Sequence, residues 1–208
     1  MAAYAAATAT TTTMQKIREA ATHDGVTPAK ETAAAYRDAL LRLFILDPLP
    51  GWTPSLSQFT RLRQAEKHHL ADPALAVSML GLSKEKLLAG EGGEAIPRDG
   101  VFLGALFESL ATLSVRVFAQ SAEAETYHLR KEDGRREVDL IVEGDGGEVV
   151  AFEVKLSARV EDADVKHLIW LRDQLGKRLR DAAVITTGPY AYRRKDGIAV
   201  VPLALLGP

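Results

Sequence analysis

The spacing of apolar and polar positions divides the chain into a helical first part and a second part that is rich in strands. Apolar residues at helical spacing predict helices over 14–22 and 27–44. Beyond residue 100 the expected order is helix, three strands, helix and two strands, over 100–119, 124–131, 137–143, 148–156, 162–179, 182–188 and 198–206. A strand, a helix and a second apolar strand predict a right-handed parallel crossover. The second part is therefore expected to be an α/β domain with a mixed sheet flanked by helices.

The first part is shorter and gives a weaker pattern. Two helices followed by extended sequence are typical of a winged helix, and a small helical packing module fits the same pattern. Residues 88–100 are rich in glycine and charge and have no periodicity, as in a linker. We expect a winged-helix-like module over residues 1–88 and the α/β domain over residues 89–208.

Composition limits the classes of function. The 208 residues are 47% hydrophobic and carry a formal net charge of -2, so DNA contacts would have to come from local basic patches. No cysteine is present, which excludes disulfides, cysteine zinc sites and thiol catalysis and favours a cytoplasmic location. No apolar run approaches the roughly 20 residues that span a bilayer, so no membrane association is expected.

The acids of the strand region point to chemistry. Asp139 lies within one apolar strand, and Glu153 and Lys155 bracket Val154 in the next. Side chains alternate across a strand, so Glu153 and Lys155 share one face, and the other face, with the apolar residues of 150–156, is expected to be core. The glycine-containing turn over 143–148 would place Asp139 beside Glu153. Two carboxylates at about 4 Å repel by roughly 4 kcal/mol, so such a pair has to share a proton, bind a cation or be well solvated.

Glu108 is a third candidate. It is the only charged residue in the apolar helical segment 101–115 and requires a partner there. We therefore expect Glu108, Asp139 and Glu153 to hold Mg²⁺ or Mn²⁺, with Lys155 assisting catalysis.

These residues resemble the PD-(D/E)XK nuclease-like superfamily, with Glu108 in the first helix, Asp139 in the second strand and Glu153-Val154-Lys155 in the third. Val138 stands where the motif has proline. More closely, most of the chain resembles the C-terminal region, of unknown function, of bacterial and archaeal AAA+-type ATPases. The stretches that carry this resemblance are "KHHLADPALA", "GALFESLA", "YHLRKEDGRREVDLIV", "AFEVKLS" and "IAVVPLALL". It implies an attached or separate P-loop ATPase domain as partner, although this sequence contains no G-x-x-x-x-G-K-[ST] motif.

Basic residues near these acids are candidates for binding DNA phosphates. They are Arg130, Lys131, Arg135 and Arg136 on the first hairpin and Lys166 and His167 on the following helix. Two functions remain open. The first is Mg²⁺-dependent cleavage of DNA phosphodiesters, and the second is a non-catalytic module that binds DNA or a protein and regulates an ATPase.

Overall fold

The computed structural model describes residues 1–54, 64–89, 100–131 and 134–207. The chain forms two compact units. The first comprises Met1–Leu49 and Ala65–Leu110, and the second comprises Pro50–Gln64 and Ala111–Pro208. The boundary expected over residues 88–100 falls mainly on residues 90–99, which lie outside the described residues.

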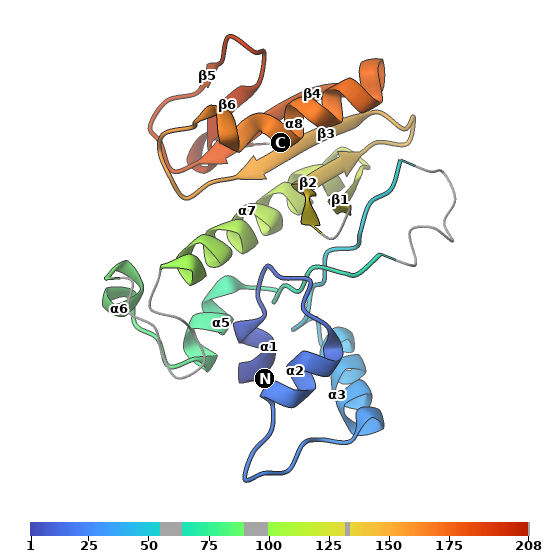
Figure 1. Ribbon diagram of the computed structural model, residues 1–208, viewed down its shortest axis with the longest axis vertical. Helices are drawn as coiled ribbons and strands as arrows, with labels where there is room; N and C mark the ends of the chain where they lie inside the picture. Colours follow the sequence, from blue (N-terminus) through green and yellow to red (C-terminus); the bar gives the residue numbers. More distant parts are fainter. Residues whose placement is uncertain (55–63, 90–99, 132–133, 208) are drawn as a thin grey trace. The chain divides into compact units, whose positions relative to one another are not determined.

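The first unit is built from short helices (Figure 1). They are α1 (Ala2–Ala6), α2 (Met14–Ala20), α3 (Lys30–Arg42), α5 (Pro73–Met79), α6 (Lys84–Leu88) and the first half of α7 (Val101–Ser121). Side chains fix several helix starts: Thr13 accepts the Lys16 N–H at the start of α2, and Asp72 accepts the Ala74 N–H at the start of α5. The two helices predicted first are thus present as α2 and α3.

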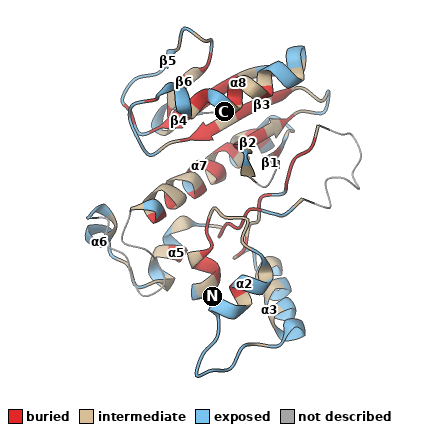
Figure 2. Ribbon diagram, in the orientation of Figure 1, coloured by how far each residue is buried: buried red, intermediate tan, exposed pale blue. Residues whose placement is uncertain are grey.

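Extended segments run between these helices, and where the structure describes them they pair through isolated bridges. Residues 67, 68 and 70 form isolated bridges with Leu49, Thr10 and Leu46. Within the described residues of this unit the extended pairing consists of such bridges, and the winged-helix module is not confirmed. Helix α3 buries none of its residues, and Figure 2 shows it mostly pale blue.

The second unit contains a six-stranded mixed sheet in the order β1-β2-β3-β4-β6-β5. Its strands are β1 (Glu125–Lys131), β2 (Arg136–Glu143), β3 (Val149–Val154), β4 (Leu179–Thr186), β5 (Tyr192–Arg193) and β6 (Ala199–Pro202). Strands β1 to β3 form an antiparallel meander, and β4 pairs in parallel with β3 and β6. Helix α8 (Asp162–Leu175) connects β3 to β4, which confirms the predicted parallel crossover, and the short helices η2 (Gly176–Arg178) and η3 (Leu203–Leu205) complete the unit.

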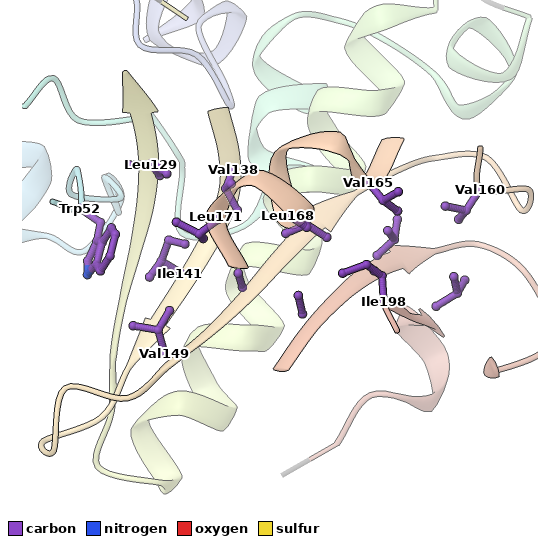
Figure 3. Packing of buried hydrophobic residues seen from close by; sticks show 14 residues of the cluster. Trp52, Leu129, Val138, Ile141, Val149, Val160, Val165, Leu168, Leu171 and Ile198 are labelled. Carbon is purple, nitrogen blue, oxygen red and sulfur yellow. The ribbon is translucent and has the colours of Figure 1, made fainter. Parts of the chain in front are cut away.

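Helix α8 covers the opposite face of β3 from the one expected. Val149 and Ala151 are fully buried and cluster with Val165, Leu168 and Leu171 of α8 (Figure 3). On the face that was expected to be core, Val154 is buried, residues 150 and 152 are half-buried and Leu156 is exposed, so that expectation is confirmed only in part. The consequence is that Glu153, which shares the face of Val149 and Ala151, lies at the edge of the α8-covered core.

Helix α7 is long and apolar enough to cross a membrane, which corrects the expectation that no segment has this length. Its 21 residues include Glu108 and Arg116, and two charges leave the helix predominantly apolar. Phe102 and Leu106 lie in the core of the first unit, and Ala111, Val115 and Ala119 continue a buried stripe at four-residue spacing. A stripe of this kind is the pattern of a helix that packs one face on a core.

Arg178 ties residues 50–54 to the sheet of the second unit. Its guanidinium donates to Gly147 O at 2.5 Å, to Pro54 O at 3.1 Å and to buried Glu143 at 2.5 Å. It also lies 5.5 Å from the ring centroid of Trp52, a core residue that is 1% exposed. One side chain thereby connects β2, the β2–β3 turn and the segment that carries Trp52.

We expect Arg178→Met to lower the free energy of unfolding of the second unit by about 2–4 kcal/mol, because a buried carboxylate loses its charged donor. Arg178→Lys should lose nearly as much, since a lysine cannot reproduce the forked geometry. Urea unfolding followed by tryptophan fluorescence measures this, because Trp52 and Trp170 both belong to this unit. The exposed neighbour Arg180 provides the control, and an Arg180→Met variant as unstable as Arg178→Met would contradict the assignment.

Candidate functional site

Asp139 and Glu153 form a buried pair on neighbouring strands. The β2–β3 register pairs Leu140 with Phe152, so the next pair along the ladder is Asp139 with Glu153, as the hairpin turn predicted. Asp139 is 9% exposed and Glu153 is 5% exposed. The Val154 N–H donates to Asp139 Oδ2 at 3.0 Å, which fixes the Asp139 carboxylate across the strand ends.

Ionisation of both carboxylates of the pair is energetically unfavourable. Burial raises the pKa of Glu153 well above its usual range, and the adjacent Asp139 charge raises it further. Glu153 Oε1 is buried and accepts no hydrogen bond from the described residues, whereas Oε2 accepts one from Lys155 Nζ at 3.2 Å. Glu153 therefore favours a proton, or another positive charge, at the site.

Lys155 supplies a cation directly after β3. Burial lowers the pKa of Lys155, but the charges of Glu153 and Asp139 raise it by more, so its pKa lies above the ordinary value. The side chain of Lys155 is 34% exposed, in contrast to 7% for that of Glu153. The ammonium is thus charged, held by the acid and reachable from solvent.

His167 of α8 borders the pair. Its Nδ1 lies 2.6 Å from the Glu137 carbonyl oxygen and 3.9 Å from Glu153 Oε1. A carbonyl oxygen only accepts, so Nδ1 carries a proton and, in the neutral ring, Nε2 is the acceptor. Lys166, the preceding residue, is exposed.

The basic residues of the first hairpin lie beside the same strands. Arg130 pairs in register with Glu137, and Lys131 pairs with Arg136. The Arg136 guanidinium lies 5.2 Å from the Trp170 ring centroid, so α8 holds it. Arg135 is exposed.

Glu108 belongs to the first unit and has a partner there. Its Oε1 accepts a hydrogen bond from Lys67 Nζ at 2.7 Å, and the Lys67 side chain is only 2% exposed. Lys67 was not among the residues predicted to contribute to a site. The sequence indicates it only as a lysine within the extended segment before "HHL". The convergence of Glu108 with Asp139 and Glu153 stays a prediction.

The two histidines that follow Lys67 are occupied in separate contacts. His68 bonds the Tyr4 hydroxyl at 3.0 Å and the Thr12 carbonyl at 2.6 Å, and burial lowers its pKa. His69 Nδ1 lies 3.1 Å from Ser109 Oγ. Adjacent residues on an extended segment point in opposite directions, which explains why the two rings have different partners.

Few side chains near the site are candidate metal ligands. Among the described residues no group of three or more histidine, aspartate or glutamate side chains is arranged to hold a metal ion. Mg²⁺ is commonly bound through only one or two carboxylates together with water and substrate phosphates. The hard oxygens of Asp139 and Glu153, including the unbonded Glu153 Oε1, fit that mode of binding.

We expect Lys67→Met to destabilise the first unit by about 3 kcal/mol, because Glu108 then loses the cation that binds it in an apolar helix. Lys67→Met combined with Glu108→Leu should recover most of that loss. Thermal unfolding followed by circular dichroism provides the measurement, with the exposed Lys86→Met as control. If Lys67→Met alone is neutral, the ion pair does not stabilise the unit.

Comparisons with known proteins agree with a chain of two parts. Residues 1–86 match a domain of unknown function (DUF8612). The searches of curated proteins and of solved structures found no match. Residues 103–206, half of the chain, match a domain of unknown function (DUF4143) that is typically found in AAA-ATPase-associated proteins. The chain therefore belongs to the DUF4143 family.

Proposed function

We propose that the second unit is a nuclease-like domain that cleaves DNA phosphodiesters with a divalent metal ion. The observation that carries this proposal is the buried Asp139–Glu153 pair, in which the Glu153 pKa is raised well above its usual range by burial and by Asp139. A structural carboxylate that is 5% exposed is normally satisfied by donors, yet in the part of the chain that the structure describes no group donates to Glu153 Oε1. Such a strained acid is typical of a functional site.

Asp139 and Glu153 are the residues that would hold Mg²⁺ or Mn²⁺. When bound, the ion would neutralise their repulsion and polarise a phosphate oxygen. The backbone N–H of Val154 donates to Asp139 Oδ2 and thereby fixes the orientation of this carboxylate.

Lys155 is proposed to stabilise negative charge on the attacked phosphate. Its ammonium is anchored to Glu153 at 3.2 Å and is one-third exposed, so it combines a defined position with access to substrate. The residues proposed to contact the DNA backbone are Arg130, Lys131, Arg135, Arg136, Lys166 and His167. The family context adds an attached or separate ATPase as partner.

One observation favours the alternative, a non-catalytic module that binds DNA or protein and regulates an ATPase. Glu108, the third acid of the nuclease motif, already forms an ion pair with buried Lys67 at 2.7 Å. A protein that has lost catalysis would keep the fold and use this acid for stability. Metal binding and cleavage distinguish the two functions.

We expect Mn²⁺ to bind the intact chain at up to millimolar concentration and each of Asp139→Asn and Glu153→Gln to abolish that binding, because each removes an anionic ligand. Isothermal titration calorimetry measures the binding, and a panel of single-stranded, duplex and branched DNA tests cleavage. Asp173→Asn, which alters an exposed acid of α8, is the matched control. Absence of heat with the unaltered chain rejects the metal site, and binding without cleavage favours the regulatory module.

The raised Glu153 pKa gives stability a defined pH dependence. Between about pH 4.3, where an unfolded glutamate titrates, and the higher folded pKa, the folded state binds more protons than the unfolded state. The contribution of Glu153 to stability is therefore present at low pH and declines as pH rises through this window. Lys155, which is partly exposed, can be hydrated when its partner is neutral.

We accordingly expect Glu153→Gln to raise the melting temperature at pH 8 in the absence of metal and to have almost no effect near pH 4. The gain should grow steadily with pH, since glutamine does not ionise. Thermal melts at several pH values measure it, with the exposed Glu125→Gln as control. A variant that is less stable than the parent at pH 8 would show that Glu153 is a structural partner of Lys155.

A further inference from the structure

Two exposed tyrosines lie beyond the end of β4. Tyr190 is 76% exposed and Tyr192 is 47% exposed, so both present aromatic surface to solvent. Tyr190 follows β4, and Tyr192 begins the two-residue edge strand β5. Strands β3 and β4 are parallel, so their carboxyl ends meet at one edge of the sheet, where ligands bind in open α/β folds.

Residues 187–191, which connect β4 to β5 and are called the tyrosine loop below, are joined to the loop that carries Lys155. The Lys155 N–H donates to Ile185 O at 2.9 Å, and Thr187 Oγ1 donates to Leu156 O at 2.7 Å. A Cβ on Gly188 would lie only 3.1 Å from the Ala158 carbonyl oxygen. The backbones of the two loops therefore lie in close contact. Tyr190 follows the contact at Gly188 by two residues.

Two arginines hold the segment in place. Arg193 forms two hydrogen bonds with Asp181, at 2.9 and 2.8 Å, and a third with Gly197 O at 2.8 Å. Arg194 binds Asp162 at 2.5 Å and Val160 O at 3.2 Å. The guanidinium groups of both arginines are thus engaged within the protein. Their role is to fix the tyrosine-bearing segment, and a rigid platform loses little entropy when it binds.

We infer that Tyr190 and Tyr192 form a platform on which nucleobases of single-stranded DNA stack. Exposed aromatic rings accept any base by stacking, whereas the bases of a duplex are already stacked on each other. The inference rests on the proposed function in one respect, because it names the substrate class of that site.

Charge alone would not bind a strand at this edge. Glu153, Asp139 and Asp164 all act electrostatically on Lys155, so two carboxylate charges oppose one ammonium even when Glu153 holds a proton. Without metal, phosphate attraction is therefore weak there, and ring stacking has to supply most of the affinity. The platform therefore differs in its mode of binding from the basic residues of the β1–β2 hairpin, which are proposed to contact phosphates.

The test measures the affinity of the intact chain for a fluorescently labelled oligo-dT by anisotropy, in buffer with EDTA. We expect the double variant Tyr190→Ala/Tyr192→Ala to raise Kd at least about tenfold, given stacking of roughly 1–3 kcal/mol per base. Tyr190→Phe/Tyr192→Phe keeps the rings and should bind within about twofold of the parent. Tyr36→Ala removes a tyrosine that is 66% exposed in the first unit and should have no effect.

Several outcomes would overturn the platform. They are no oligo-dT binding by the parent, unchanged binding by the alanine variant, equal losses with phenylalanine and alanine, and the same tyrosine dependence with duplex DNA. Thermal melts confirm that the alanine variant is folded. The oligo-dT measurement requires neither metal nor cleavage, so failure of the nuclease proposal in the metal titration and failure of the platform in this assay are distinguishable.

Discussion

The repulsion between two carboxylates on adjacent strands is the constraint around which the second unit is organised. Asp139 and Glu153 are held together by the β2–β3 register, so they cannot separate without breaking the hairpin. The Val154 N–H and the Lys155 ammonium offset part of the unfavourable energy, yet burial and, after it, the Asp139 charge keep the pKa of Glu153 well above its usual range. A fold that tolerates such a pair needs a core strong enough to hold it, and the cluster under α8 provides that core.

The element order of the second unit could be predicted because each long element has its own period. Apolar residues at helical spacing and at alternate positions distinguish helix from strand without tertiary information. The face of β3 could not be chosen in the same way, since residues 149–154 are apolar on both sides and only the position of α8 decides which side is core. Strand β5 has two residues, which is too short for any period to show.

In the candidate site, too, contacts between residues close in sequence could be predicted, whereas contacts between distant residues could not. The neighbourhood of Asp139 and Glu153 follows from a local hairpin, so the turn was enough to predict it. Lys67 and Glu108 are 41 residues apart, and no local pattern indicates that a lysine enters an apolar interior to meet one acid. The side chains of the tyrosine loop are likewise positioned by contacts between distant segments, such as that of Thr187 with Leu156.

The segment that carries Trp52 makes the second unit discontinuous in sequence. Residues 50–54 precede much of the first unit along the chain, yet Trp52 N donates to His128 O at 2.6 Å and its ring lies in the sheet's core. The family match at residues 103–206 does not include this tryptophan. A fragment that starts after residue 100 would therefore lack the Trp52 ring, which belongs to the same core cluster as Leu129 and Val138. His128 and Arg178, which both contact Trp52, follow it by 76 and 126 residues (128 − 52 and 178 − 52), so Trp52 is synthesised well before the residues against which it packs.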